Sequence, residues 1–184
     1  MQQPYQDLIN ELNKTIDQKR IITDPTLTLA YGTDASFYRL TPKLVLQLDS
    51  IDEVVLAVKA CGQRNIPLTF RAAGTSLSGQ AISDSVLITL TTNWRQYKIL
   101  DEGKQIWLQP GVIGADANKY LAPYGRMIGP DPASINTCKI GGIAANNASG
   151  MCCGTAKNSY KTLAGMTIVL ADGTILDTLS NESV

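Results

Sequence analysis

Short apolar runs separated by turn residues dominate the pattern of this 184-residue chain, and they predict a mixture of helices and strands. Residues 5–16 carry apolar side chains at Leu8, Ile9, Leu12 and Ile16, the spacing of one helix face. Such a helix would pack either on this domain or on a partner outside this sequence. Pro25 suits the first turn of a short helix, and an irregular loop is expected over residues 31–36. We therefore interpret residues 1–40 as an N-terminal helix and an irregular lead-in.

A strand, a helix and two further strands follow, in the order expected of a small mixed α/β lobe. Residues 44–48 form a continuous apolar run, and Ser50 to Glu53 matches a capping box that begins a helix reaching about Arg64. Apolar runs at 66–70 and 86–90 predict two more strands, with a right-handed crossover. We assign residues 41–100 to this first lobe. The helix positions expected to face the core are Val54, Val55, Val58 and Cys61.

Two turn signals predict hairpins in the second half of the chain. The first hairpin joins residues 94–100 to 105–109 across Asp101-Glu-Gly103, and the second joins 166–170 to 174–179 across Ala171-Asp172-Gly173. A helix is expected between them over residues 115–121, with Ala117, Tyr120 and Leu121 facing inward. We assign residues 101–184 to a second lobe, which the last hairpin would close.

The residues between the strands at 66–70 and 86–90 are mostly small or polar, and we name residues 71–80 the phosphate loop. With little side-chain bulk, successive backbone N–H groups can turn inward as donors to phosphate oxygens. Gly74 and Gly79 have Walker A spacing, but Gln80 and Ala81 stand where that loop has Lys and Ser or Thr, and no Rossmann fingerprint opens a helix here. We predict a diphosphate-binding loop at a strand end; a connector without a ligand is the alternative. The expected donors are the N–H groups of Ala73, Gly74, Thr75 and Ser76.

A second stretch of small, almost uncharged residues runs from Ile128 to Gly154, and we name it the small-residue segment. Its glycines permit close backbone approach, and Asn146, Asn147 and Ser149 offer amide and hydroxyl groups. We interpret this segment and the phosphate loop as two walls of one narrow slot. Asn147-Ala148-Ser149 also matches a turn or a glycosylation acceptor, but the N-terminal residues lack the pattern of an export signal.

Composition narrows the function classes. The chain has 16 basic and 16 acidic residues and no basic cluster, which argues against nucleic-acid binding. No apolar stretch approaches the ~20 residues that cross a bilayer, so a cytoplasmic protein with no membrane span is expected. There is no histidine, and the four cysteines lack Cys-x-x-Cys spacing, so no metal site is predicted here. The adjacent Cys152 and Cys153 are either packed thiols or a redox pair.

Five ordered motifs resemble the FAD-binding domain of the p-cresol methylhydroxylase / vanillyl-alcohol oxidase superfamily: residues 71–80, 109–112, 129–134, 140–142 and 146–150. Within it, they are most similar to the D-lactate dehydrogenase, glycolate oxidase and D-2-hydroxyglutarate dehydrogenase group. Residues 150–160 resemble large members that continue into a C-terminal iron-sulfur region. One departure is Ala72-Ala73, where many relatives have glycines. The resemblance implies an α+β, two-lobed FAD-binding domain with mixed sheets and flanking helices, and the cofactor between the lobes.

The resemblance also implies a set of FAD contacts, and some of its members have a second interpretation. Arg71 is alternatively a structural ion-pair partner at the strand end, and Pro110 with Gly111 is alternatively a simple turn. Asp34 is either a polar contact near the cofactor or a loop cap. The adenine would meet Ile168 or its neighbours. The full expected set is Arg71, Ala72, Ala73, Gly74, Thr75, Ser76, Gly79, Gln80, Pro110, Gly111, Pro130, Asp131, Ala133, Ser134, Gly141, Gly142, Asn146, Ser149, Gly150 and Ile168.

The resemblance implies an FAD-linked oxidoreductase acting on a CH–OH group, with a small D-2-hydroxy acid as substrate and an open choice of electron acceptor. Because the chain has no His and the phosphate loop has no Cys, we expect noncovalent FAD. Oxidising a hydroxy acid needs a base, usually His, so the catalytic residues are expected outside this sequence, in a substrate domain, and the chain alone is expected to be inactive. Any iron-sulfur cluster is expected only in a further C-terminal part. The alternatives are an NADPH-using reductase of the same superfamily and a non-enzymatic nucleotide-binding domain.

Overall fold

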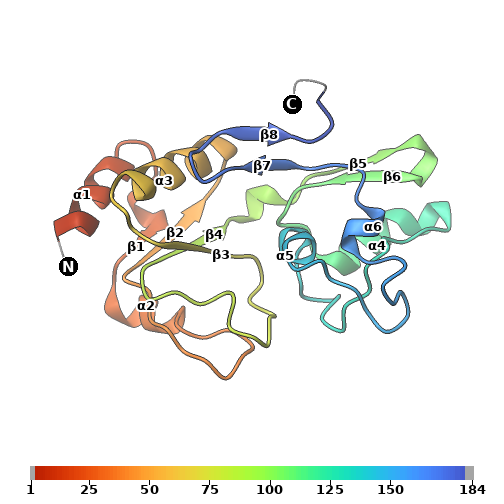
Figure 1. Ribbon diagram of the computed structural model, residues 1–184, viewed down its shortest axis with the longest axis horizontal. Coiled ribbons are helices and arrows are strands. Elements are labelled where there is room, and N and C mark those ends of the chain that lie inside the picture. The colour runs from red at the N-terminus through yellow and green to blue at the C-terminus, as the bar shows by residue number, and fades with distance from the viewer. Residues whose placement is uncertain (1–2, 181–184) are drawn as a thin grey trace. The chain divides into compact units, whose positions relative to one another are not determined.

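The computed structural model describes residues 3–180, and the chain forms two compact units (Figure 1). Unit 1 combines the chain up to Thr91 with the chain from Gly165 onward, and unit 2 is residues 92–164. These bounds differ from the expected lobes, which divide at residues 100 and 101. The division falls before residue 97 because β5 (Tyr97–Leu100) pairs with β6 (Gln105–Leu108), and unit 1 regains the last hairpin because that hairpin packs on it.

Unit 1 is built on a four-stranded sheet in the order β1 (Ile21–Ile22), β2 (Leu44–Leu48), β4 (Val86–Leu90) and β3 (Leu68–Arg71). Strands β2, β4 and β3 are parallel, whereas β1 is antiparallel to β2. The expected runs at 44–48 and 86–90 are confirmed, and β4 lies between β2 and β3. Both central strands are fully buried along most of their length, as their uninterrupted apolar sequences require.

Three helices accompany this sheet: α1 (Gln3–Leu12), α2 (Pro25–Ala30) and α3 (Ile51–Gln63). Helices α1 and α3 lie side by side, and the side chains of Leu8 and Leu12 are completely buried (Figure 1). The N-terminal helix therefore packs on this domain. Pro25 occupies the first turn of α2, and the Asp24 side chain caps that helix by accepting hydrogen bonds from the N–H groups of Thr26 and Leu27.

Helix α3 begins at the predicted place, but its capping box is only half formed. The hydroxyl of Ser50 accepts a hydrogen bond from the N–H of Glu53 at 3.2 Å. The carboxylate of Glu53 does not return to Ser50; instead it accepts a hydrogen bond from the N–H of Asp49 at 2.6 Å. Val54, Val58 and Cys61 are buried as expected, and Val55 is half-buried.

The C-terminal hairpin consists of β7 (Thr167–Val169) and β8 (Ile175–Asp177), antiparallel as predicted. It packs against α3 in unit 1 and does not belong to the unit formed by residues 92–164, which departs from the expected second lobe. The turn glycine, Gly173, has φ +80° and lies against the aliphatic chain of Lys59. The contact with Lys59 joins residues over a hundred positions apart, which a local pattern does not reveal.

Unit 2 contains the hairpin β5 (Tyr97–Leu100) and β6 (Gln105–Leu108), with α4 (Gly114–Leu121), α5 (Ile140–Ala145) and α6 (Ser159–Thr162). The predicted hairpin is confirmed, although Trp94 lies in a short 3-10 turn before β5. Ala117 and Leu121 are buried as expected, whereas Tyr120 is half-buried and stacks on Tyr97 with ring centroids 3.7 Å apart. No helix among the described residues is long and apolar enough to cross a membrane.

A half-buried ion pair ties the start of β1 to the start of α3. The guanidinium of Arg20 donates to both carboxylate oxygens of Glu53, at 2.7 and 2.6 Å, and also to the carbonyl of Gln47. Asp49 lies 3.3 Å from the same guanidinium. The hydrogen bonds from Arg20 outweigh the burial of Glu53 and hold the pKa of its carboxyl below the ordinary value.

Replacing Glu53 with Gln is expected to lower the free energy of unfolding at pH 7 by about 2 kcal/mol. This is less than the ~3 to 5 kcal/mol typical of a broken buried pair, because Asp49 still faces Arg20. The lowered pKa stabilises the fold above the unfolded-state value of about 4.3, and this contribution is lost as pH falls through the folded-state pKa. Urea unfolding should therefore show a difference between the two proteins that shrinks below about pH 4.

The matched control is Lys104→Gln, which removes the exposed pair with Asp101 and should change stability by less than ~0.5 kcal/mol. An unchanged unfolding midpoint for Glu53→Gln at pH 7 would contradict this account of Arg20.

Candidate functional site: the phosphate loop and the small-residue segment

The phosphate loop leaves the sheet at Arg71, the last residue of β3, and presents unpaired backbone donors. Gly74 and Gly79 have φ of +68° and +75°, the left-handed conformation that glycine adopts without strain. The N–H groups of residues 73–76 donate no hydrogen bond to any residue within 3–180. Neighbouring N–H groups in such a loop form a concavity that suits an anion. The four N–H groups that the sequence predicted as donors are therefore available to an anion within the described chain. That they bind a diphosphate stays a prediction.

Hydrogen bonds inside unit 1 fix the shape of the phosphate loop. Nε of Arg71 donates to the carbonyl of Ala81 at 2.7 Å, which closes the base of the loop. The N–H of Ala35 donates to the carbonyl of Gly74 at 2.9 Å, which attaches the preceding segment to the middle of the loop. Ser76 is hydrogen-bonded to Gln80 and accepts from the N–H of Ser78. A loop held in this way loses little conformational entropy when a ligand binds.

Asp34 and Arg71 carry opposite charges close to the phosphate loop. Oδ1 of Asp34 accepts a hydrogen bond from the N–H of Ser36 at 2.8 Å, so its predicted role as a loop cap is confirmed. Burial opposes ionisation of Asp34, but the hydrogen bonds from Ser36, the charge of Arg71 and the backbone N–H of Ala81 together hold the pKa of its carboxyl below the ordinary value. Burial lowers the pKa of Arg71, which nevertheless stays charged at neutral pH. Within 3–180 the two side chains form no direct ion pair.

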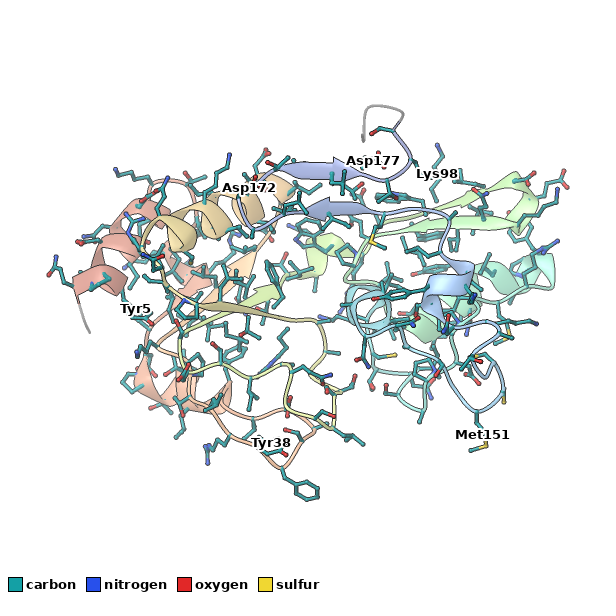
Figure 2. All side chains as sticks on the ribbon, in the orientation of Figure 1. Tyr5, Tyr38, Lys98, Met151, Asp172 and Asp177 are labelled. Atoms are coloured by element: carbon teal, nitrogen blue, oxygen red, sulfur yellow. The ribbon has the colours of Figure 1, made fainter. Side chains whose placement is uncertain are left out.

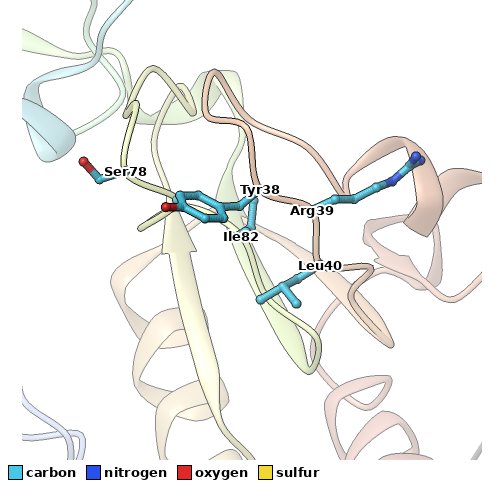
Figure 3. A pocket seen from close by; sticks show the side chains of 6 residues that line it. Tyr38, Arg39, Leu40, Ser78 and Ile82 are labelled. Carbon is cyan, nitrogen blue, oxygen red and sulfur yellow. The ribbon is translucent and has the colours of Figure 1, made fainter.

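A hollow of about 310 Å³ lies beside the end of the phosphate loop and is lined by Tyr38, Arg39, Leu40, Ser78, Gly79 and Ile82 (Figure 3). The Tyr38 ring occupies the space where a side chain at Gly79 would be, since a Cβ there would lie 2.8 Å from a ring carbon. Gly79 is therefore required both by its backbone angle and by this contact. Sequence reasoning missed Tyr38, because an exposed loop tyrosine carries no pattern that places it against a glycine far along the chain.

The glycines of the small-residue segment are needed because the chain packs on itself. A Cβ at Gly150 would lie 1.7 Å from the carbonyl oxygen of Asp131, and one at Gly141 would lie 2.9 Å from Cβ of Pro110. The N–H of Gly141 also donates to the carbonyl of Pro110 at 2.9 Å. Close backbone approach was expected at both glycines, but the neighbours observed are protein atoms. Pro130 is buried, whereas Ala133, Asn146 and Ser149 are exposed and Asp131, Ser134 and Gly142 are half-buried.

The turn interpretation of Pro110 and Gly111 is confirmed. The N–H of Val112 donates to the carbonyl of Gln109, and the N–H of Gly111 donates to the carbonyl of Trp94 at 2.9 Å. A side chain at Gly111 would lie 2.5 Å from that carbonyl oxygen, so only glycine fits. Asn147, at φ +44°, accepts from the N–H of Tyr160 and so attaches the segment to α6.

Sequence reasoning also missed Lys139, the only basic residue in the small-residue segment. It is half-buried at the residue before α5 and forms no ion pair within the described chain. Burial lowers the pKa of its ammonium, and the nearby positive charge of Arg95 lowers it further. The available signal was its position as the only basic residue in a stretch whose only other charged residue is Asp131.

The predicted contacts belong to different units. Residues 71–80 and Ile168 lie in unit 1, where Ile168 pairs with Leu176 in the C-terminal hairpin. Pro110, Gly111 and the small-residue segment lie in unit 2. The slot expected between the phosphate loop and the small-residue segment stays a prediction.

The cysteines differ sharply in exposure. Cys61 and Cys138 are buried, whereas Cys152 is exposed and follows Met151, whose side chain projects from the ribbon (Figure 2). Burial raises the pKa of the Cys61 thiol to about 11. Burial also raises the pKa of Cys138, against a smaller opposing contribution from Ser134.

Comparison with known sequences decides the family. A family described as "FAD binding domain" matches residues 42–179, most of the chain. This chain belongs to that family. Its relatives include glycolate oxidase subunit GlcD of Escherichia coli K12, 30% identical over 81% of this chain and 30% of the relative. D-lactate dehydrogenase [cytochrome] 1 of Saccharomyces cerevisiae is 33% identical over 74% of this chain and 24% of the relative.

The relatives are much longer than this chain. D-2-hydroxyglutarate dehydrogenase of Haemophilus influenzae is 28% identical over 97% of this chain, which corresponds to 18% of the relative. Among solved structures, alkyldihydroxyacetonephosphate synthase aligns with TM-score 0.79 at 18% identity, over 97% of this chain and 39% of the other. p-Cresol methylhydroxylase aligns with TM-score 0.79 at 14% identity, over 100% of this chain and 38% of the other. At these identities the structures show the fold, and the expected α+β FAD-binding fold is confirmed.

Replacing Gly150 with Ala is expected to destabilise the protein without any ligand present, by roughly 3 kcal/mol, because the new Cβ would overlap backbone atoms of Asp131. Thermal unfolding of the ligand-free chain measures this. The matched control is Gly62→Ala in α3, where the nearest atom to a Cβ is 3.9 Å away, and a gain of about 0.5 to 1 kcal/mol is expected. Equal stability of Gly150→Ala and wild type would contradict the packing role.

Alkylation at pH 8 is expected to label Cys152 first and to leave Cys61 unmodified until the protein unfolds. The thiolate is the reactive form, and a pKa of about 11 leaves Cys61 almost entirely protonated. Mass spectrometry of peptides after timed iodoacetamide treatment, with and without urea, gives the order. Rapid labelling of Cys61 in the native protein would contradict the buried position of its thiol.

Proposed function

We propose that this chain binds FAD noncovalently and that the phosphate loop holds the diphosphate. Unpaired backbone donors in a loop with two left-handed glycines carry this proposal, and membership of the FAD binding domain family supports it. Four donors at one anion suffice for tight binding, since each charge-assisted hydrogen bond contributes about 1.5 to 3 kcal/mol. With no His in the chain and no Cys in the loop, these residues offer no common point of covalent attachment.

Both segments are proposed to contribute contacts to FAD. In the phosphate loop these come from residues 71–76, Gly79 and Gln80. The remaining proposed contacts are Pro110, Gly111, Pro130, Asp131, Ala133, Ser134, Gly141, Gly142, Asn146, Ser149 and Gly150, with Ile168 toward the adenine. For Gly141, Gly111 and Gly150 the structure already gives a packing reason, so a ligand contact there would involve backbone groups only.

The activity that best fits this family membership is oxidation of a small D-2-hydroxy acid. Three relatives bear the names D-2-hydroxyglutarate dehydrogenase, glycolate oxidase subunit and D-lactate dehydrogenase. FAD would supply the acceptor for the substrate hydride. This chain's residues would hold the cofactor, and the proton acceptor is expected elsewhere, because the chain has no histidine. The electron acceptor and any iron-sulfur centre are likewise expected in a further part of the protein.

Adding a negative charge to the phosphate loop is expected to weaken FAD binding. Ala73 is exposed, so Ala73→Asp should leave folding intact while placing a carboxylate beside the diphosphate. We expect the Kd for FAD to rise tenfold or more, about 1.4 kcal/mol, measured by titration of the visible flavin spectrum. The matched control is Asn13→Asp, which adds the same charge at an exposed position after α1 and should leave the Kd unchanged.

Two results would count against the proposal. The first is a folded wild-type chain that binds no FAD, and the second is equal affinity of Ala73→Asp and Asn13→Asp. Acid denaturation of the complex distinguishes covalent from noncovalent FAD. A noncovalent flavin stays in solution when the protein precipitates, whereas a covalent flavin precipitates with the protein.

A further inference from the structure

By hydrogen-bond geometry, two buried atoms of unit 1 lack a partner within residues 3–180: Oδ2 of Asp34 and Nη2 of Arg71. The backbone of Ala81 lies close enough to the Asp34 carboxylate to help lower its pKa, but it forms no hydrogen bond of normal geometry with Oδ2. The two atoms belong to side chains of opposite charge that attract each other. Both side chains lie against Gly74, where a Cβ would be 3.5 Å from Cβ of Asp34 and 3.5 Å from Cδ of Arg71. A buried charged atom without a partner is costly, so a donor and an acceptor orphaned in one place indicate a shared partner.

The chemistry of the two atoms selects that partner. Nη2 needs an acceptor, and Oδ2 of an ionised carboxylate needs a donor. A water molecule supplies both, whereas an anion would be repelled by Asp34 and a cation by Arg71. The Asx turn to Ser36 holds Oδ1 and thereby fixes the direction in which Oδ2 points.

The other two nitrogens of the guanidinium have distinct environments. Nε donates a hydrogen bond to the carbonyl of Ala81 at 2.7 Å. Nη1 is not among the buried orphaned atoms and has no hydrogen bond to a described residue, so it is accessible. If Nη2 were held as well as Nε, the side chain would present Nη1 in a fixed direction.

We propose that Asp34 is a positioning residue of the phosphate loop, which holds the Arg71 guanidinium through one bridging water and leaves Nη1 for the diphosphate. The proposal rests on the proposed binding of FAD. Asp34 itself touches no ligand and acts through Arg71. The adjacent hydrogen bond from Ala35 to Gly74 connects the same segment to the loop a second time.

A double-mutant cycle on FAD affinity tests this role. Asp34→Asn keeps the size of the side chain and the acceptor for Ser36 but removes the charge, and Arg71→Gln removes the guanidinium. We expect Asp34→Asn to weaken FAD binding roughly tenfold in the wild-type background and to have no effect in the Arg71→Gln background, as coupled neighbours do. The 31P resonances of bound FAD should also shift in Asp34→Asn, a change that mere loss of stability does not cause.

Asp24→Asn is the matched control, because Asp24 also accepts backbone N–H groups through Oδ1 but does so as the N-cap of α2. It should leave both the Kd and the 31P spectrum unchanged. Equal FAD affinity of Asp34→Asn and wild type overturns the proposal, as does an effect of Asp34→Asn that persists undiminished without Arg71.

A high-resolution crystal structure of the wild-type chain provides a measurement independent of FAD and of variant folding. An ordered water within hydrogen-bond distance of both Oδ2 of Asp34 and Nη2 of Arg71 supports the proposal. A direct contact between the two side chains, or separate protein partners for each, overturns it. If the wild type binds no FAD, the proposed function fails while this structure still decides the water bridge.

Discussion

The hydrogen bond from Nε of Arg71 to the carbonyl of Ala81 is the constraint on which the phosphate loop depends. It joins the end of β3 to the residue after the loop, so that the intervening residues form a closed curve of fixed size. Within that curve, Gly74 and Gly79 adopt left-handed backbone angles, and the N–H groups of residues 73–76 have no acceptor among the described residues. Donors fixed before a ligand arrives need no reorganisation energy, which is the physical advantage of a loop over a set of flexible lysines.

Glycine serves two different purposes in this chain. In the phosphate loop it permits left-handed backbone angles, whereas Gly141 and Gly150 allow two stretches of backbone to touch. The second purpose explains why the small-residue segment is poor in bulk even where no ligand contact is needed. A glycine-rich sequence is therefore ambiguous evidence for a ligand until the neighbours of each Cα are known.

Local patterns predicted the elements well and their partners poorly. The strands at 44–48 and 86–90 and the start of α3 followed from apolar runs and from Ser50, because burial and capping are encoded within a few residues. The second half of the capping box failed because Arg20, far away in sequence, binds Glu53. The packing of the last hairpin on α3 was likewise not predictable from local patterns, because these elements are remote in sequence. For the candidate site, the loop was predictable from composition, but the orientations of Asp34 and Tyr38 depend on contacts that sequence spacing does not express.

Strand β3 is an edge strand of the four-stranded sheet and is only four residues long. A strand in this position offers unpaired peptide groups to any other chain that meets it, which is how many proteins begin to aggregate. Phe70, half exposed on this strand, adds an apolar contact to that risk. Because β3 has only four residues, it can form few intermolecular hydrogen bonds, which limits this risk. The end of β3 at Arg71, where the phosphate loop begins, thus also keeps this edge strand short.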